Sequence, residues 1–205
     1  MRRATFIGTG VALPTPEIGN NDLFRALGID KPGSWLTERF GIEMRRLDLD
    51  LATMQPVEGL SDTVLAEQAC RHALDDADAD PREVDLLVHV TCTPDEVHFM
   101  ASVIALKERL GLRPDAMVDH VDSGCAGLAK AFTDVCAFVK AGRARTVLVV
   151  ASNFPSAFIR VNAPMYVAQK IWLSPVVFGD GAGAVLLRAS DESDRGILDV
   201  FYEVD

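Results

Sequence analysis

The stretch Val121-Asp-Ser-Gly-Cys-Ala-Gly127 decides the fold of this chain. It joins a strand-like apolar run at Ala116–Val121 to a long apolar helical pattern over about Ala126–Ala141. Small residues stand on both sides of Cys125, as an abrupt strand-to-helix turn requires where the backbone passes close to itself. We therefore expect Cys125 to lie at a helix N-terminus.

That position suits a nucleophile. A helix N-terminus has unpaired N–H groups and a macrodipole that favour negative charge. A thiol held there is expected to form the thiolate, which is the reactive species. The alternative is a buried, inert cysteine, since free cysteines are among the most buried residues. The small residues around Cys125 favour the first interpretation, so Cys125 is the predicted catalytic residue.

Hydrophobic periodicity predicts an α/β fold. Apolar runs bounded by turn residues indicate five strands, at Ala4–Gly8, Val84–Thr91, Ala116–Val121, Thr146–Ala151 and about Ala184–Arg188. Apolar residues at helical spacing indicate helices at Ser61–Ala77, Ala101–Leu110 and Ala126–Ala141. Strands that alternate with helices predict a central, mostly parallel sheet.

One segment departs from this alternation. Asn20–Leu47 is polar and aromatic, and it precedes the first clear helix. A long irregular insertion in an α/β domain is often a binding loop. A solvated surface cover is the alternative.

Composition excludes several classes of protein. The 205 residues have a net charge of −10 and a pI of about 4.8, which argues against nucleic-acid binding. The four cysteines form no Cys-x-x-Cys pair and no zinc-site spacing with histidine, so we expect no metal and a reduced, cytoplasmic protein. No apolar run approaches the length of a membrane span.

Two glycine-containing runs have the composition of nucleotide-binding loops. Phe178-Gly-Asp-Gly-Ala-Gly-Ala184 leads into a strand, whereas a dinucleotide-binding fingerprint follows a strand and opens a helix. Its glycines, Gly179, Gly181 and Gly183, instead predict close backbone approach between strands or beneath an active site. Gly8-Thr-Gly10 is interpreted as a turn at the end of the first strand.

The remaining reactive side chains give weaker signals. His89 lies in an apolar strand and is expected to point into the interior, and His120 lies in the strand before Cys125. His98 stands in a loop, where it is either solvated or lines a pocket. Cys92, at a strand end, is interpreted as a small core residue, with an approach to the Cys125 site as the alternative.

Taken in order, these motifs resemble the N-terminal half of β-ketoacyl-ACP synthase III, a condensing enzyme of the thiolase superfamily. The resemblance runs over nearly the whole chain, through Gly8-Thr-Gly-Val-Ala-Leu-Pro14, Asn21-Asp22-Leu23, Trp35-Leu-Thr-Glu-Arg-Phe-Gly-Ile42, the Cys125 stretch and the Phe178–Ala184 run. It implies a thiolase-like fold with an N-terminal βαβαβαββ-type half. It also implies that Cys125 takes an acyl group from acyl-CoA or acyl carrier protein, which is then condensed with a malonyl thioester.

The resemblance also implies roles for other residues. Trp35 would stack on the CoA adenine and Arg39 would contact its phosphates. His98, Phe99 and Met100 resemble the family's acyl-pocket loop, which reaches across a homodimer interface. Between Asn153 and Pro175 the chain is longer than the family pattern, with Met165, Tyr166 and Trp172 inserted. No bound cofactor or metal is implied.

The family's catalytic His and Asn lie in a second, similar half, and this chain stops where that half would begin. We therefore expect residues 1–190 to form the N-terminal half-domain and residues 191–205 to begin the connection to a C-terminal half, needed in cis or in trans. Two alternatives remain open. The acyl group passes to an alcohol or amine in an acyltransferase of secondary metabolism, or the chain is a non-catalytic partner subunit or fragment.

Overall fold

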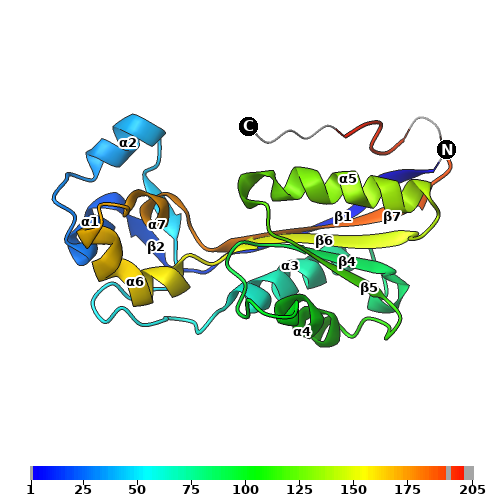
Figure 1. The fold of residues 1–205 in the computed structure, drawn as a ribbon, viewed down its shortest axis with the longest axis horizontal. Helices are drawn as coiled ribbons and strands as arrows, with labels where there is room; N and C mark the ends of the chain where they lie inside the picture. Colours follow the sequence, from blue (N-terminus) through cyan, green and yellow to red (C-terminus); the bar gives the residue numbers. More distant parts are fainter. Residues whose placement is uncertain (1, 193–194, 201–205) are drawn as a thin grey trace. The chain divides into compact units, whose positions relative to one another are not determined.

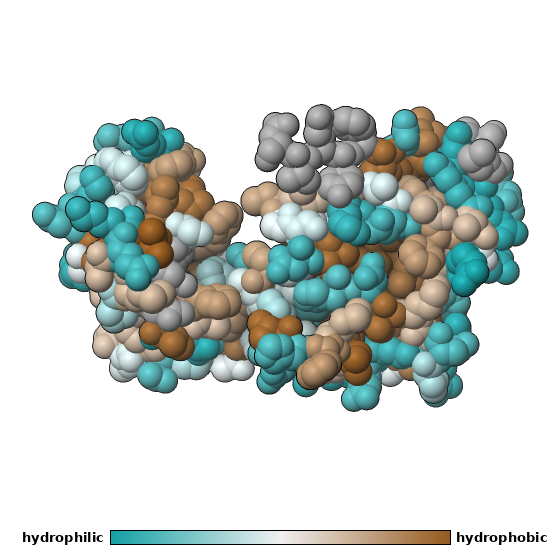
Figure 2. Space-filling model, viewed as in Figure 1, coloured by the Kyte–Doolittle hydropathy of each residue, from teal (hydrophilic) through white to brown (hydrophobic). Residues whose placement is uncertain are grey.

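The chain folds into two compact units (Figure 1). The computed structural model describes residues 2–192 and 195–200. The sheet unit draws on residues 1–12, 62–152 and 182–205, and the small unit on residues 13–61 and 153–181. On the face drawn in Figure 2, polar residues cover much of each unit, with apolar residues between them.

The five predicted strands are present and form one sheet, in the order β1-β7-β6-β4-β5. Their bounds are β1 Arg3–Ala12, β4 Leu86–Val90, β5 Met117–Val121, β6 Thr146–Asn153 and β7 Gly181–Ser190. β4 pairs in parallel with both β5 and β6, whereas β7 is antiparallel to β1. The carboxyl ends of parallel strands meet at one edge of a sheet, so the segments that follow β4 and β5 are neighbours.

Helices cover both faces of this sheet (Figure 1). α5 (Gly127–Lys140) lies on one face, and α3 (Asp62–Asp76) and α4 (Ala101–Leu110) lie on the other, with a short 3₁₀ turn, η1, at Pro81–Glu83. The predicted helices agree with these bounds to within one residue at each end. Gly111 and Gly142 follow α4 and α5 with φ of 70° and 69°, as expected for glycines that end helices.

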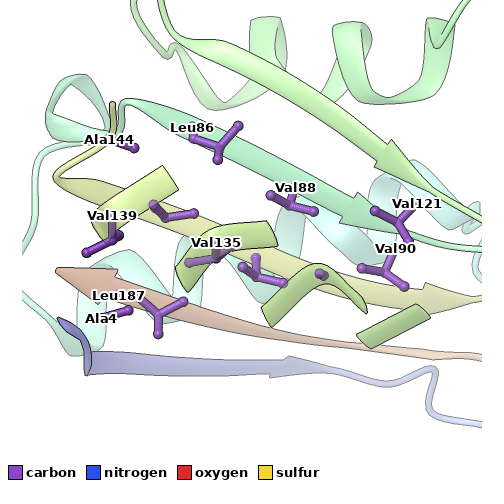
Figure 3. Packing of buried hydrophobic residues seen from close by; sticks show 12 residues of the cluster. Ala4, Leu86, Val88, Val90, Val121, Val135, Val139, Ala144 and Leu187 are labelled. Carbon is purple, nitrogen blue, oxygen red and sulfur yellow. The ribbon is translucent and has the colours of Figure 1, made fainter. Parts of the chain in front are cut away.

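One layer of the core of the sheet unit lies between α5 and the sheet (Figure 3). Val135 and Val139 of α5 pack against a layer that includes Val88 of β4 and Leu187 of β7, and all four are essentially buried. β4 is buried along its whole length, which explains its uninterrupted apolar sequence. Each such side chain contributes about 1.5–3 kcal/mol relative to exposure.

Gly8 and Gly10 correct the sequence interpretation, which placed them in a turn at the end of the first strand. Both lie inside β1, where α3 packs closely on the strand. A Cβ at Gly8 would lie 2.3 Å from the carbonyl oxygen of Ala73, and a Cβ at Gly10 would lie 2.1 Å from that of Ala69. The glycines therefore permit strand–helix contact that any side chain would block.

The expectation of an irregular insertion at Asn20–Leu47 is wrong. This segment forms regular elements together with residues 153–181: β2 Glu17–Gly19, α1 Asn20–Leu27, α2 Ser34–Phe40, β3 Met44–Arg46, α6 Ser156–Ala168 and α7 Leu173–Val177. β2 and β3 pair antiparallel. Leu23, Phe24, Leu36 and Ile159 are fully buried, so the unit has a core of its own.

A buried carboxyl group links separate segments of the small unit by hydrogen bonds. Asp180, in the glycine run before β7, accepts hydrogen bonds from the amide of Ser156 at the start of α6 (3.0 Å) and from the amide of Asp48 (2.7 Å). The Ser156 hydroxyl also donates to it. Burial raises the pKa of Asp180, against the opposing effect of these hydrogen bonds. This run therefore supplies a buried carboxyl group that binds the backbone amides of Asp48 and Ser156.

Two further points concern the chain as a whole. No helix in residues 2–192 and 195–200 has the length and apolar character needed to cross a bilayer. The predicted boundary at residue 190 stays a prediction, because residues 193–194 and 201–205 of the expected connection lie outside the described residues.

Candidate active site

Cys125 lies in the turn between β5 and α5. β5 ends at Val121, a 3₁₀ turn (η2) spans Gly124–Ala126, and α5 begins at Gly127. Gly124 has φ of 51°, in the left-handed region, and the amide of Ala126 donates to the Ser123 carbonyl oxygen at 3.2 Å. The side chain of Cys125 is exposed. The thiol is therefore accessible, two residues before the first turn of α5.

Close packing requires a glycine at position 127, directly after this turn. A Cβ at Gly127 would lie 2.7 Å from Cγ1 of Val90, at the end of β4. The backbone at the start of α5 thus passes close to the neighbouring strand, as the small residues around Cys125 predicted.

The interpretation of Cys92 as a small core residue is wrong, because its side chain is exposed. The amide of Thr91 donates to the Val121 carbonyl oxygen at 3.1 Å, which continues the β4–β5 ladder one residue beyond β4. Burial, followed by the Asp122 carboxylate, raises the pKa of the Cys92 thiol, and Cys125 adds to the rise. The parallel pairing of β4 with β5 places Cys92 and Cys125 beyond the carboxyl ends of neighbouring strands.

Hydrogen bonds fix the backbone on both sides of this second thiol. The hydroxyls of Thr91 and Thr93 donate to Oδ1 of Asp62 at 3.0 and 3.1 Å, and the amide of Thr93 donates to Oγ1 of Thr91 at 3.0 Å. The Asp95 carboxylate accepts from the amides of Asp62 (3.1 Å) and Thr63 (3.0 Å) at the start of α3. The segment after β4 is thus held to α3 at several points.

A buried polar network lies behind this segment. His89 points into the interior, as predicted, with Nε2 2.8 Å from Oγ of Ser152 and 3.2 Å from Oδ2 of Asp62. Its ring centroid lies 6.0 Å from that of His120, whose pKa is lowered by burial and then by His89. Sequence reasoning missed the network. Its signal is the presence of His89 and Ser152 in otherwise apolar strands.

The predicted acyl-pocket residues form an exposed loop between β4 and α4. Phe99 is 94% exposed, and Phe99 and Met100 both have left-handed φ, of 58° and 57°. The rings of His98 and Phe99 lie 6.1 Å apart between centroids. Consecutive non-glycine residues with positive φ are strained and need support from their surroundings. The loop therefore presents apolar side chains to solvent in the single chain, and its role stays a prediction.

The predicted nucleotide-binding residues lie in the small unit. The indole of Trp35 is partly exposed, with Nζ of Lys31 4.9 Å and Cζ of Arg39 6.0 Å from its ring centroid. Trp172, from the segment that is longer than the family pattern, meets Trp35 edge to face at 5.7 Å, and Phe40 does so at 6.1 Å. An aromatic surface with two cations suits a nucleobase and its phosphates.

The three glycines predicted as a structural loop lie in different surroundings. A Cβ at Gly179 would lie 2.9 Å from the carbonyl oxygen of Arg46, so the close approach is present there. Gly181 and Gly183 belong to β7, and a Cβ at Gly183 would have no neighbour within 4 Å. Their part in an active site stays a prediction. Within residues 2–192 and 195–200, His, Cys, Asp and Glu side chains form no cluster able to hold a metal ion.

Comparison with known proteins finds similarity to one family of condensing enzymes. A family model of 3-oxoacyl-[acyl-carrier-protein (ACP)] synthase III matches residues 120–205. The β-ketoacyl-[acyl-carrier-protein] synthase III of Rhodospirillum rubrum is 35% identical over 209 residues, which cover 100% of this chain and 59% of that protein. The chain thus spans little more than half the length of the curated relatives it matches.

Solved structures agree with this result. The 3-oxoacyl-(acyl carrier protein) synthase III of Pseudomonas aeruginosa is 28% identical with a TM-score of 0.75, over 95% of this chain and 54% of that one. AbyA1, a tetronic acid condensing enzyme, is 30% identical with a TM-score of 0.77, over 94% of this chain and 56% of that one. These likenesses confirm the predicted thiolase-like fold. By sequence and by fold, the chain is similar over nearly its whole length to part of the β-ketoacyl-ACP synthase III condensing enzymes.

Proposed function

We propose that this chain is the acyl-loading part of a condensing enzyme. Cys125 takes an acyl group from acyl-CoA, or from the phosphopantetheine of an acyl carrier protein, and the acyl group is then joined to a malonyl thioester. The observation that carries the proposal is the exposed Cys125 thiol in the glycine-rich turn between β5 and α5.

The loading step follows from the position of the thiol. The sulfur of Cys125 attacks the thioester carbonyl, the new S–C bond forms as the bond to the CoA sulfur breaks, and CoA leaves as a thiol with the proton. The first amides of α5 have no partner within the helix, and the positive end of the helix dipole lies at this turn. Both stabilise negative charge on the attacking sulfur and on the tetrahedral intermediate.

The condensation step needs groups that the family resemblance assigns to a second half. Loss of CO₂ from the malonyl thioester leaves a carbanion, which attacks the Cys125 thioester, forms the carbon–carbon bond and releases the Cys125 thiol. A His and an Asn would polarise the malonyl thioester and stabilise the enolate. We propose that a C-terminal half supplies this pair, in cis or in trans.

The nucleotide end of acyl-CoA is proposed to bind the small unit. Adenine would stack on the partly exposed face of Trp35, and the phosphates would bind the Arg39 guanidinium. Lys31, 4.9 Å from the indole centroid, adds a second cation to the same surface. A nucleobase that stacks on this face would displace the Lys31 ammonium toward the phosphates.

The acyl chain is proposed to contact the loop of His98, Phe99 and Met100. Its apolar side chains are exposed in the single chain, with Phe99 94% exposed. A homodimer in which this loop lies at the interface would bury them, as the family resemblance implies. Exposed apolar side chains of this kind mark interaction surfaces.

A different acceptor is the second candidate. AbyA1, named a tetronic acid condensing enzyme, is as similar in fold as the fatty-acid-type synthases. The second candidate is therefore an acyltransferase that passes the acyl group from Cys125 to an alcohol or amine, and the likeness to AbyA1 supports only that this fold also serves products other than β-ketoacyl-ACP.

The test supplies acyl-CoA and a malonyl thioester to the chain together with a C-terminal half of a synthase III. The expected product is the β-ketoacyl thioester with release of CO₂, and Cys125→Ala should abolish both. Ester or amide formation with an added alcohol or amine, without CO₂ release, would favour the second candidate. Full condensing activity of Cys125→Ala would contradict both.

A further inference from the structure

Cys92 is a second exposed thiol at the same edge of the sheet as Cys125, and neither loading nor condensation uses it. We infer that Cys92 and Cys125 form a reversible disulfide when a hydroperoxide oxidises the site. The pair is thus a redox modification site, and the inference does not depend on which acyl donor or acceptor the enzyme uses.

Strand pairing brings the two segments together. β4 and β5 are parallel neighbours with Val90 opposite Val121, and adjacent strands lie about 4.8 Å apart. The bond from the Thr91 amide to the Val121 carbonyl oxygen extends this pairing to the residue before Cys92. After β5, which ends at Val121, Gly124 has a left-handed φ and begins the 3₁₀ turn. Cys125 is the second residue of this turn, so it lies only a few residues beyond the end of β5.

The segment that carries Cys92 is held in place. A disulfide requires two Cα atoms about 4.4–6.8 Å apart and suitably directed side chains, so a fixed backbone matters. Thr91 and Thr93, on either side of Cys92, both donate to the buried carboxylate of Asp62. This frame fixes the backbone around the second thiol, and the exposure of both thiols leaves them open to a small oxidant.

The other two cysteines are unsuited to this role. Cys70 lies in α3 and Cys136 in α5, and both are buried. Burial raises the pKa of both thiols, which removes the reactive thiolate. They serve as internal controls for the experiment.

The chemistry balances with one equivalent of hydroperoxide. The thiolate of Cys125 attacks the peroxide O–O bond and becomes a sulfenic acid, while the peroxide is reduced to water or an alcohol. The sulfur of Cys92 then displaces the sulfenic oxygen, which leaves as water, and the S–S bond forms. Cys125 reacts first in this scheme because it lies before the positive end of the α5 dipole, which stabilises a thiolate.

The disulfide would protect the nucleophile. A sulfenic acid without a thiol nearby is oxidised further to a sulfinic acid, which common reductants do not reverse. Capture by Cys92 stops this second oxidation, and a thiol reductant restores Cys125 by exchange. Acyl transfer would be switched off during oxidation and recovered afterwards.

The experiment treats the reduced chain with one equivalent of hydrogen peroxide, alkylates the remaining thiols and digests with trypsin. Each cysteine falls on its own tryptic peptide: Leu47–Arg71 for Cys70, Glu83–Lys107 for Cys92, Leu110–Lys130 for Cys125 and Ala131–Lys140 for Cys136. The expected product is a cross-link between Glu83–Lys107 and Leu110–Lys130 within one chain, lost on reduction. With a second equivalent of hydrogen peroxide, Cys92→Ser should carry Cys125 on to the sulfinic acid, whereas Cys136→Ala should form the same cross-link as wild type.

Three results would overturn the inference. The first is oxidation of Cys125 to sulfenic or sulfinic acid in the wild type while Cys92 remains alkylated. The second is a cross-link to Cys70, to Cys136 or between chains. The third is the absence of oxidation at either thiol. No acyl donor is present, so failure here leaves the proposed acyl transfer to be judged by its own test.

Discussion

At the scale of single residues, the account rests on the difference between Cys125 and the other three cysteines. Cys125 is exposed in a turn at the positive end of α5. Cys70 and Cys136 are buried in helices, and the pKa of Cys92 is raised by burial and by Asp122. Each difference lowers the reactivity of the other three relative to Cys125.

We therefore predict that iodoacetamide alkylates Cys125 first in the native chain, Cys92 more slowly, and Cys70 and Cys136 only after unfolding. Raising the pH should accelerate Cys92 more than an ordinary thiol, because its raised pKa leaves more thiol to ionise. Peptide-resolved mass spectrometry measures all four rates, and unfolding in urea supplies the control in which they converge. Alkylation of Cys92 ahead of Cys125 at neutral pH would contradict the account.

At the scale of elements, the contact between β1 and α3 depends on glycine. Gly10→Ala would place a methyl group 2.1 Å from the Ala69 carbonyl oxygen. We predict a loss of at least about 2–3 kcal/mol of unfolding free energy, since neither backbone can move away without disrupting the sheet or helix. Gly183→Ala, on the paired strand β7 with no neighbour within 4 Å, should stay within about 0.5 kcal/mol of wild type. Equal effects in urea denaturation would contradict this packing.

Asp85 joins the starts of three strands. Its carboxylate accepts from the amides of Arg145 (2.8 Å) and Thr146 (3.1 Å) and from the Arg113 side chain (3.0 Å). Burial alone would raise the pKa of Asp85, but these hydrogen bonds together lower it. Because the pKa of Asp85 is lower in the folded chain than in the unfolded chain, its carboxylate stabilises the fold at any pH above the ordinary carboxyl pKa. This contribution to the free energy of unfolding is lost as the pH falls through the lowered pKa.

Asp85→Ala should therefore lower the unfolding free energy at pH 7 by about 1 kcal/mol, a modest figure because the carboxylate is partly exposed. The difference from wild type should shrink as the pH falls below about 4. Asp115→Ala removes an exposed carboxylate that binds the same Arg113 and should have no measurable effect. A gap between Asp85→Ala and wild type that stays constant down to pH 2 would contradict this assignment.

Local patterns account for what the sequence predicted well. The strands and helices of the sheet unit are long apolar or amphipathic runs, so their positions follow from residues next to one another. The strand-to-helix turn at Cys125 followed from its small residues in the same way. The small unit did not, because its strands β2 and β3 have three residues each and its core brings Ile159 to distant Leu23.

Other features depend on tertiary contacts that no local pattern reports. The role of Gly10 follows from its contact with α3, some sixty residues along the chain. The exposure of Cys92 depends on where β4 ends relative to β5. The contacts of the Asp62 carboxylate with His89 and Thr91 join residues about thirty positions apart, which no local pattern links.

At the scale of the whole molecule, the sheet unit exposes apolar side chains on α5 and β1. Phe6 and Phe132 pack edge to face at 5.8 Å, and Leu128 lies one helical turn before Phe132. Phe6 and Leu128 are each nearly half exposed. An apolar surface of this kind promotes association unless a partner covers it.

We predict that the isolated chain binds a hydrophobic dye and self-associates as its concentration rises. Leu128→Gln should reduce dye fluorescence, whereas a polar substitution at Val57, exposed in the small unit, should leave the contribution of the sheet unit unchanged. Dye fluorescence and light scattering measure the two effects. A chain that stays monomeric at high concentration and binds no dye would show that this apolar surface does not promote association.

The central claim is that Cys125 accepts an acyl group, and intact mass spectrometry tests it most directly. The chain is mixed with a panel of acyl-CoAs, alone and with a synthase III C-terminal half, and Cys125→Ala is treated in parallel. The account predicts a mass gain of one acyl group that is absent in Cys125→Ala and maps to Leu110–Lys130. No gain with any donor in either condition, or a gain that persists in Cys125→Ala, would contradict it.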